Sequence, residues 1–368
     1  MTDCVEKTDA RVWRVLLCLT PAKLAKLQWG DIDALAAQMR GPHRAEITLV
    51  APEALAKEQR VFDVAVTKVT DQIVACAEAG DGNGNGNDDG KDSVTAAARR
   101  ELAAVEAYLA AHPETVAVDP VPVQRLLCRR DVLCDTLAAL CAAPVPAPGA
   151  PVVRGARYCV GGCAGLRFPV MCKRVGACGI PASHRMAIAF GPRGVAAFAA
   201  GAGSVVCQEY VNHGARLHKV FCVGPAHVFV HTRPSLPDLA PAAPGAPEPA
   251  PLLFDNARPT APQVAAWAAE RPECLPAAPA APDAGDAGDA GDALDTALVD
   301  AIARRVSAAF GGVRLFGFDV VVERGSGDAV VLDVNYFSSY RGCLTGPQFF
   351  DVLLDTLATE ERDRAPHH

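Results

Sequence analysis

The chain reads LFGFDVVVERGSGDAVVLDVNYF over residues 315–337, two apolar runs separated by glycine, serine and glycine. Valine-rich runs on either side of a short glycine turn are typical of a β-hairpin. Centring the turn on Ser326 gives the cross-strand pairs by symmetry: Glu323 with Ala329, Val321 with Val331, and Asp319 with Asp333. Because side chains alternate between the two faces of a strand, Asn335 is expected on the same face as the two aspartates.

The expected cluster of Asp319, Asp333 and Asn335 predicts a metal site. Two carboxylates directly opposite each other on a sheet repel unless a cation lies between them. Carboxylate and amide oxygens suit a hard divalent ion such as Mg²⁺, which uses few protein ligands together with phosphate oxygens. The alternative is that each aspartate caps a strand end or pairs with a lysine. The opposition of the two aspartates favours the metal.

The first third of the chain alternates between apolar runs and helical patterns. Strands are expected at Trp13–Leu19, Glu46–Val50, Val61–Val69 and Thr115–Val118, and helices at Ser93–His112 and Val123–Leu140. This alternation predicts a small open sheet with helices packed on it. The run GDGNGNGNDDGKD, before Ser93, is too polar to order itself and is expected to be a flexible insertion.

After a proline- and alanine-rich linker at 142–150, strand patterns dominate. The expected strands are FPVMCK, MAIAF, SVVCQEYV, HKVFCV and HVFVHT, followed after a gap by helices at Leu294–Phe310 and Phe349–Leu357. The gap, Pro234–Ala293, ends in DAGDAGDAGD and is expected to be a disordered insertion. A calcium-binding repeat would need oxygen ligands at a spacing that this run lacks.

Composition excludes several classes of protein. A net charge of −7 argues against a nucleic-acid-binding surface, and no apolar run is long enough to span a membrane. Acidic residues precede any apolar run, so no secretory or transit signal is expected and the location is expected to be cytoplasmic. The fourteen cysteines form no C-x-x-C pair, which favours reduced, mostly buried thiols over a zinc site.

Basic residues inside the apolar strands suggest an anionic ligand. Lys68, Lys173, Lys219 and Arg233 each lie in or at the end of such a run. A buried ammonium needs a partner, and any single one of these is most simply an edge-strand lysine whose charge reaches water. Four of them in an acidic chain favour one shared anion. His184 is a further candidate, whereas Lys23 and Lys26 suit a solvated helix face. VGGCAG, before FPVMCK, lacks the Walker pattern. VGACG, just after Lys173, lies between two expected strands, where a glycine-rich loop can cover phosphates, but its composition alone does not carry that prediction.

Taken together, these segments resemble the inositol 1,3,4-trisphosphate 5/6-kinase family, also called inositol-tetrakisphosphate 1-kinases. The resemblance extends from Val12 to Leu357 and is strongest in VCQEYVNHGARLHKVFCVG, VHTRPSLPD, LFGFDVVV and VVLDVNYF, with VQRLLCRRDVLCDTL and FPVMCKRVGACGIPASHRMAIAF as further matches. It implies an α/β (α+β) ATP-grasp fold with a small N-terminal open-sheet domain. The implied boundaries are 10–115 for that domain, with an insertion near 80–92, and 116–360 for the kinase domain, with an insertion near 240–293.

The resemblance also implies residue roles, by matching position. ATP contacts fall on Arg129, Lys173, Gln208, Glu209, Tyr210, Val211, Lys219 and Ser235. Inositol phosphate contacts fall on Lys23, Lys68, His184, Lys219, Asn335 and Ser339. Magnesium ligands fall on Asp319, Asp333 and Asn335, and catalysis on Lys173, Lys219 and Asp333.

The chain departs from the family pattern at three places. Thr67 precedes Lys68 where members carry histidine, Cys178 stands where members carry aspartate or histidine, and Ser339 replaces a glycine. The side chain of Ser339 adds bulk where the family backbone approaches the substrate. The departures therefore bear on which inositol phosphate binds rather than on the type of reaction.

The expected protein is a monomeric kinase that uses ATP and two Mg²⁺ ions to phosphorylate a hydroxyl of an inositol polyphosphate. Two alternatives remain open at this point. One is an ATP-grasp carboxylate–amine ligase, which needs no set of lysines for a polyphosphorylated ligand. The other is a non-catalytic inositol phosphate sensor, which the departures at Thr67 and Ser339 favour.

Overall fold

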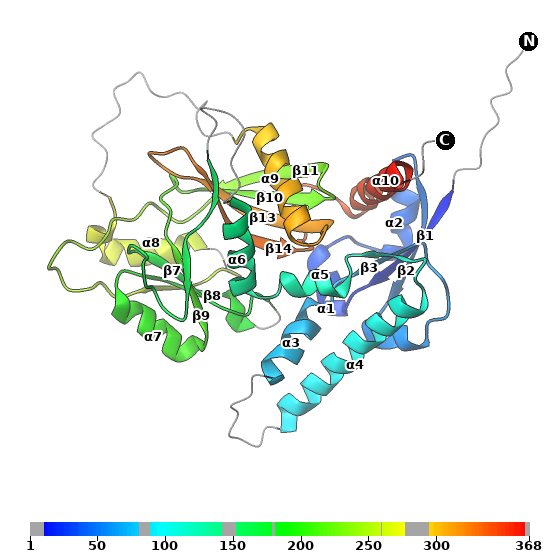
Figure 1. Cartoon of the computed structure of the whole chain (residues 1–368), viewed down its shortest axis with the longest axis horizontal. Helices are drawn as coiled ribbons and strands as arrows, with labels where there is room; N and C mark the ends of the chain where they lie inside the picture. The colour runs from blue at the N-terminus through cyan, green and yellow to red at the C-terminus, as the bar shows by residue number, and fades with distance from the viewer. Residues whose placement is uncertain are drawn as a thin grey trace, which may run out of the picture.

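The computed structural model describes residues 11–80, 89–141, 152–178, 181–258, 260–276 and 294–364. Within these ranges the strands form one four-stranded sheet and two five-stranded sheets. Figure 1 shows the four-stranded sheet at one end of an elongated molecule and the two larger sheets at the other.

The four-stranded sheet is entirely parallel and comes from the first third of the chain. Its strands, in spatial order, are β2 (Arg44–Val50), β1 (Val12–Cys18), β3 (Val64–Thr67) and β4 (Val116–Val118). The strands predicted here are confirmed. However, β4 belongs to this sheet, so the predicted domain boundary at residue 115 would remove its last strand.

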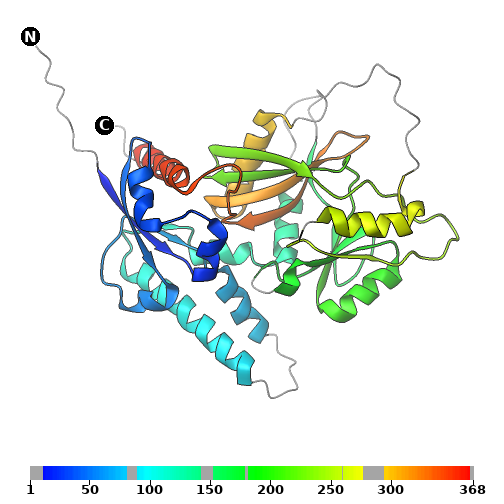
Figure 2. The ribbon, with the colours of Figure 1, turned by 180° about the vertical axis from the view of Figure 1, so that it is seen from behind.

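Helices cover both faces of this sheet because β1 is apolar on both sides. Leu16 and Cys18 contribute to one core, with α3 (Thr70–Gly80) and α4 (Asp89–Ala111). The alternate residues Trp13, Val15 and Leu17 point to the other core, with α2 (Ile32–Gln38) and α10 (Gly346–Arg364). Figure 2 shows that α10, from the far end of the chain, lies against this N-terminal layer beside α2.

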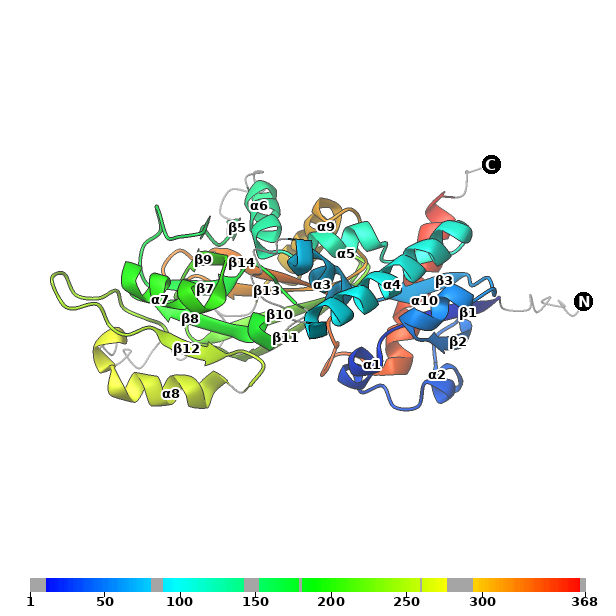
Figure 3. The ribbon, with the colours of Figure 1, turned by 90° about the horizontal axis from the view of Figure 1, so that it is seen from below.

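The two larger sheets carry the rest of the chain. The first contains, in order, β11 (His227–Pro234), β10 (Arg216–Val223), β13 (Leu315–Val322), β14 (Ala329–Tyr336) and β5 (Val153–Gly155). The second contains β12 (Leu252–Asp255), β8 (Arg185–Ala189), β7 (Val170–Arg174), β9 (Val205–Glu209) and β6 (Tyr158–Val160). Figure 3 shows α6 (Arg130–Cys141) and α9 (Thr296–Ala309) on one side of this region and α8 (Thr260–Glu270) on the opposite side.

The predicted hairpin forms as β13 and β14, with a correction to its register. Asp319 pairs with Asp333, as predicted. A bulge between Asp319 and Val320 then shifts the register, so Val321 faces Val330 and not Val331, and the predicted pairing of Glu323 with Ala329 is wrong. The extra residue on β14, Leu332, leaves the regular ladder, and a bulge frees backbone groups for other partners.

The expected disordered insertion at Pro234–Ala293 is wrong for its first part. Between residues 240 and 276 the chain forms β12, α8 and the short helix η3 (Pro272–Cys274). The Trp267 ring on α8 stacks on Phe190, with ring centroids 5.4 Å apart. The alanine- and proline-rich composition predicted disorder, but a few large apolar side chains such as Trp267 are sufficient to order this segment. The run DAGDAGDAGD lies outside the described residues, as do residues 81–88 of the first insertion.

The single helix expected at Val123–Leu140 is two helices, α5 (Val121–Leu126) and α6. Between them, Arg129 forms an antiparallel bridge with Gly176, in the loop that follows β7. The N–H of Arg130 donates to the carbonyl of Val175 at 2.8 Å. This long-range pairing overrides local helix propensity and fixes the position of the loop.

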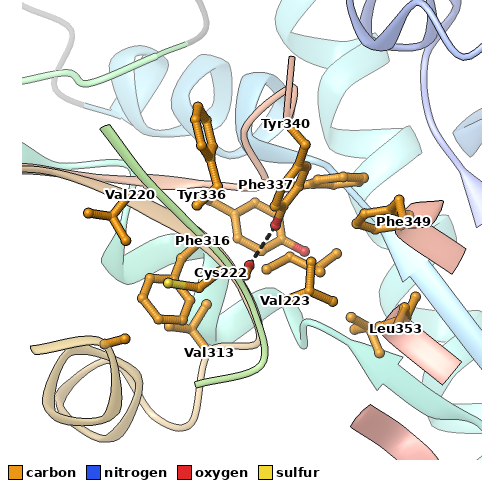
Figure 4. Packing of buried hydrophobic residues seen from close by; sticks show 14 of the residues in the cluster. Val220, Cys222, Val223, Val313, Phe316, Tyr336, Phe337, Tyr340, Phe349 and Leu353 are labelled. Atoms are coloured by element: carbon orange, nitrogen blue, oxygen red, sulfur yellow. Dashed lines mark hydrogen bonds between the residues drawn. The ribbon is translucent and has the colours of Figure 1, made fainter. Parts of the chain in front are cut away.

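A cluster of aromatic side chains fixes the segment that follows β14. Phe337, Tyr340 and Phe349 are fully buried and in mutual contact, and Figure 4 shows them packed beside β10. The hydroxyl of Tyr340 donates to the carbonyl of Cys222 at 2.7 Å. The backbone after Asn335 is thereby held against both the first large sheet and the N-terminal layer.

Candidate active site

The first large sheet presents carboxylates on the face that points away from the helices α6 and α9. Asp319 pairs in register with Asp333 on one side and with Lys219 on the other. Lys219 Nζ lies 3.1 Å from Asp319 Oδ1. Asn335 lies two residues beyond Asp333 on the same strand and therefore on the same face. One ammonium thus stands beside two carboxylates that face each other.

This arrangement fits a divalent cation. A directly opposed pair of carboxylates is unfavourable without added positive charge, and Lys219 supplies only one. The described residues contain no group of three or more His, Cys, Asp or Glu side chains suited to a metal ion. The set here has two carboxylates and an amide, which matches an ion that takes its remaining ligands from phosphate and water.

Lys173, on β7 of the second large sheet, bonds to β14 of the first, at the residue before Asp333. Lys173 is only 8% exposed, and its ammonium donates to Gln208 Oε1 at 2.8 Å and to the Leu332 carbonyl at 3.5 Å. Gln208 Nε2 donates to the same carbonyl at 3.1 Å. The bulge at Leu332 therefore provides the oxygen that ties β7 and β9 of one sheet to β14 of the other.

A cluster of buried apolar side chains lies next to this lysine, on the side of Leu332. It is formed by Ala156, Val211, Leu217, Val321 and Val330, with Leu332 partly buried against it. The members come from β10, β13 and β14 of the first large sheet, from the link between β5 and β6, and from the segment after β9. An apolar cluster next to a lysine and two carboxylates is the kind of lining that nucleotide sites use, with apolar side chains near the base and charges near the phosphates.

Glu209 and Tyr210 hold the segment after β9 in place. Burial raises the pKa of the Glu209 carboxyl, but hydrogen bonds from Arg157 and Arg154 outweigh burial and leave the pKa below its usual value. Arg157 Nε donates to Glu209 at 2.9 Å, Arg154 forms a second ion pair with it, and the Tyr210 hydroxyl donates to the Pro237 carbonyl at 2.5 Å. A pocket of 730 Å³ opens beside these arginines, away from Asp319 and Asp333.

A second group of charges lies where the N-terminal layer meets the segment after β14. Lys68 Nζ donates to the Phe337 carbonyl at 2.6 Å, and Lys23 Nζ donates to Asp71 Oδ1 at 2.7 Å. Burial, and then the nearby charge of Lys23, lower the pKa of the Lys68 ammonium to about 7. The structure therefore brings Lys23, Lys68 and the segment carrying Ser339 to one place.

Lys23 reaches this place because α1 (Pro21–Leu27) begins immediately after β1. Thr20 Oγ1 accepts a hydrogen bond from the Lys23 N–H at 3.3 Å, and proline occupies the first helical position. Both features stabilise a helix N-terminus. Lys23 is thus held at the carboxyl edge of the parallel sheet, close to Lys68 at the end of β3.

Three of the predicted site residues have local partners instead. His184 Nδ1 lies 2.9 Å from Asn256 Oδ1, just after β12. The Ser235 N–H donates to the Ala215 carbonyl at 2.8 Å, where β11 ends. Arg129 forms a two-point pair with Asp131, with its Nη2 donating to Oδ2 at 2.6 Å.

Arg130, which no sequence motif singled out, organises the loop after Lys173. It is 5% exposed, and its Nη1 donates to the carbonyls of Arg174 and Gly176, each at 2.9 Å. A signal was available, since Arg130 is four residues before Cys134 and seven before Leu137, both buried on α6. An arginine on the buried stripe of a helix has to find acceptors inside the protein.

Replacing Arg130 with methionine is expected to raise KM for ATP about tenfold, with a smaller change in kcat, because the loop loses two charged hydrogen bonds of about 1.5–3 kcal/mol each. Steady-state kinetics at varied ATP measures the split. Arg125→Met is the matched control, since Arg125 is exposed and pairs with Glu106 only at the surface. An unchanged KM in Arg130→Met, in a folded protein, would contradict the positioning role.

Comparisons with known proteins agree with this geometry. A family model described as the inositol 1,3,4-trisphosphate 5/6-kinase ATP-grasp domain matches residues 156–359. The chain is 27% identical over 360 residues to inositol-tetrakisphosphate 1-kinase of Xenopus laevis, covering 94% of this chain and 78% of the relative. It is 33% identical over 331 residues to inositol-tetrakisphosphate 1-kinase 4 of Oryza sativa subsp. indica, covering 88% and 78%.

Solved structures show the fold. The chain superimposes on the ATP-grasp ligase PsnB with a TM-score of 0.50 and 12% identity, covering 94% of this chain and 99% of that one.

No helix among the described residues is long and apolar enough to cross a membrane. The expected ATP-grasp fold is confirmed, and with it the general use of ATP and a divalent metal. The chain belongs to the inositol 1,3,4-trisphosphate 5/6-kinase family and is an ATP-grasp inositol phosphate kinase.

Proposed function

We propose that this chain transfers the γ-phosphate of ATP to a hydroxyl of an inositol polyphosphate at the face that carries Asp319, Asp333 and Asn335. The observation that carries this proposal is the direct pairing of Asp319 with Asp333. The same chain provides Lys173 and, in a second group, the lysines Lys23 and Lys68. One group of charges suits a nucleotide with its metal, and the other suits a second polyanion.

In this proposal the two large sheets bind ATP and its metal ions, and the N-terminal layer binds the inositol phosphate. Lys173 and Arg129 hold phosphates of ATP, and Asp319, Asp333 and Asn335 hold two magnesium ions. When bound, the ions neutralise charge on the β- and γ-phosphates during transfer. Lys219, whose ammonium lies beside Asp319, is proposed to contact both ATP and the inositol phosphate. Positioning and charge stabilisation account for most of the catalysis of phosphoryl transfer, so no general base is assigned.

The substrate side of the site depends on the lysines. Lys23, Lys68 and Ser339 are proposed to contact the phosphates of the inositol ring. His184 and Ser235 remain proposed contacts of substrate and nucleotide, although the structure gives each a local partner. We further propose a cytoplasmic monomer, as the family resemblance implies, and sedimentation of the purified protein tests the monomer.

Incubation with γ-labelled ATP, Mg²⁺ and a panel of inositol phosphates tests the reaction, with products separated by chromatography. Label in an inositol phosphate is the expected result, and it also identifies the preferred isomer. ADP release only with an amine acceptor would instead indicate a carboxylate–amine ligase. Calorimetric binding of inositol phosphates without transfer at saturating Mg-ATP would indicate a sensor.

The lowered pKa of Lys68, to about 7, predicts a pH-dependent substrate affinity. A substrate phosphate favours the charged form of the Lys68 ammonium. Above about pH 7, where Lys68 of the free enzyme is mostly neutral, substrate binding therefore requires Lys68 to take up a proton. KM for the inositol phosphate is therefore expected to rise as pH increases above about 7, by up to about tenfold per unit. Kinetics over about pH 6.5 to 9 measure the slope.

Lys68→Arg supplies the control for this slope. Arginine stays charged throughout the range, so the variant is expected to bind with little dependence on pH. Substrate phosphates titrate near pH 6 and are nearly fully ionised above 7, which separates their effect from that of the lysine. The same slope in wild type and Lys68→Arg would contradict the placement of Lys68 against a substrate phosphate.

A further inference from the structure

Two cysteines lie close together where the loop that follows Lys173 packs on the junction of α5 and α6. Cys128 lies at the junction of α5 and α6 and is 2% exposed, whereas Cys178 lies in the loop and is half-buried. The sulfur of each lies 3.8 Å from one oxygen, the Thr70 carbonyl. The N–H of Ala177 donates to the Cys128 carbonyl at 2.9 Å, so the two chain segments are paired at this point.

The two thiols also interact directly, and unequally. A hydrogen bond from Cys128, aided by the charge of Lys23, lowers the pKa of the Cys178 thiol despite its burial and the nearby Asp71. The same hydrogen bond, with burial, raises the pKa of the Cys128 thiol. Cys178 is the less buried residue of the two, and reactive cysteines are partly exposed, so Cys178 is the nucleophilic partner.

A second thiol pair shows the same hydrogen-bonded pKa asymmetry but differs in being fully buried. Cys172 and Cys207 face each other across β7 and β9 with their sulfurs 3.9 Å apart. Both are 0% exposed, and they lie in the apolar core under α7 (Pro192–Ala202). Reactive cysteines are partly exposed and near positive charge, whereas buried ones are inert. The Cys172–Cys207 pair thus provides a matched comparison within the same protein.

We propose that Cys128 and Cys178 form a site of oxidative modification, at which hydrogen peroxide or an organic peroxide converts the two thiols into a disulfide. The Cys178 thiolate attacks one peroxide oxygen, the O–O bond breaks, and a sulfenic acid forms as hydroxide (or alkoxide) leaves and takes a proton. Cys128 sulfur then attacks the Cys178 sulfur, the S–O bond breaks, and the thiol proton leaves with hydroxide as water. For hydrogen peroxide the balance is two thiols and one peroxide giving one disulfide and two waters.

The disulfide changes the loop that begins at Lys173. A disulfide requires the two sulfurs to lie about 2.05 Å apart, so both shift within the space they share beside the Thr70 carbonyl. The loop becomes covalently fixed to the α5–α6 junction, next to Arg129. Because Lys173 precedes this loop and Lys23 and Lys68 lie beside it, the disulfide form is expected to lose at least about tenfold in kcat/KM, a loss that a thiol reductant reverses.

The bond itself is tested without any activity measurement. The full-length protein is treated with hydrogen peroxide, free thiols are blocked, and peptides are mapped without reduction. A peptide linking Cys128 to Cys178 is the expected product. Its absence, or a link between Cys172 and Cys207 in its place, overturns the proposal. This readout does not depend on the proposed reaction, so the two can fail separately.

The effect on turnover is tested with Cys178→Ser and with Cys207→Ala as the matched control, each compared with its own untreated sample. Peroxide is expected to inactivate the wild type and Cys207→Ala at least about tenfold, and to spare Cys178→Ser. Equal inactivation of Cys178→Ser and wild type would overturn the proposal. Cys178 is the residue chosen because its half-buried position tolerates serine better than the buried Cys128 does.

Discussion

Replacing Asp333 with alanine is expected to reduce kcat about 1000-fold while leaving the fold intact. The substitution removes two of the oxygens proposed to hold the metal, and loss of one preorganised group that stabilises transition-state charge costs about 100- to 1000-fold. Asp333 faces the like-charged Asp319, and its carboxylate accepts a 3.1 Å hydrogen bond from the N–H of Val334. Removing one of two opposed carboxylates costs the fold little. Single-turnover transfer from labelled ATP measures the loss.

The control for this variant is Asp328→Asn, in the turn of the same hairpin. Asp328 Oδ1 accepts a hydrogen bond from Val152 at 3.3 Å, far along the strand from Asp333. Turnover in this control is expected to stay within about twofold of wild type, because surface changes away from a site have small effects. Near-normal turnover of Asp333→Ala at saturating Mg-ATP would contradict the metal assignment.

Replacing Asp119 with alanine is expected to destabilise the fold strongly. Asp119 is 0% exposed, and its two carboxylate oxygens accept hydrogen bonds of 2.9 Å from the N–H groups of Arg314 and Leu315. Its own N–H donates to the Tyr336 hydroxyl at 2.8 Å. Alanine leaves two buried N–H groups without partners, at about 1–3 kcal/mol each. Urea denaturation measures the change in the free energy of unfolding.

The pH dependence of stability provides the check on Asp119. Burial raises the pKa of its carboxyl to about 6, despite the two backbone hydrogen bonds. Because this exceeds the unfolded value, the contribution of Asp119 is full below about pH 4 and is lost as pH rises through about 6. Wild type is expected to lose up to about 3 kcal/mol relative to Asp119→Asn across this window. Parallel stability curves for the two proteins would contradict the assignment.

The β13–β14 hairpin and the facing of its two aspartates could be predicted from the local sequence, but its bulge could not. Turn symmetry predicted the pair Asp319–Asp333, but its register is off by one residue near the turn, where Val321 faces Val330, and the bulge restores it at the aspartates. The bulge at Leu332 was not predictable, since it depends on partners from another sheet. Leu332 gives its carbonyl to Lys173 and Gln208, which are more than a hundred residues away in the chain.

Composition misled where a few residues decide the structure. Residues 240–276 are rich in alanine and proline, yet Trp267 and Phe254 bury themselves in one core with Phe190. Arg130 was missed for the opposite reason. It looks like one of two adjacent surface arginines, and only the fold brings the carbonyls of Arg174 and Gly176 to it. The buried stripe of α6 indicates that Arg130 needs acceptors inside the protein, but the local sequence does not say which carbonyls these are.

The position of the metal is the most direct test of the proposed active site. Crystals grown with Mn²⁺ in place of Mg²⁺ and a non-hydrolysable ATP analogue reveal the ion by its anomalous scattering. We expect peaks within about 2.5 Å of side-chain oxygens of Asp319, Asp333 and Asn335, beside the terminal phosphates of the analogue. Bound analogue with the ion elsewhere, or with these three side chains turned away from it, would contradict the proposed site.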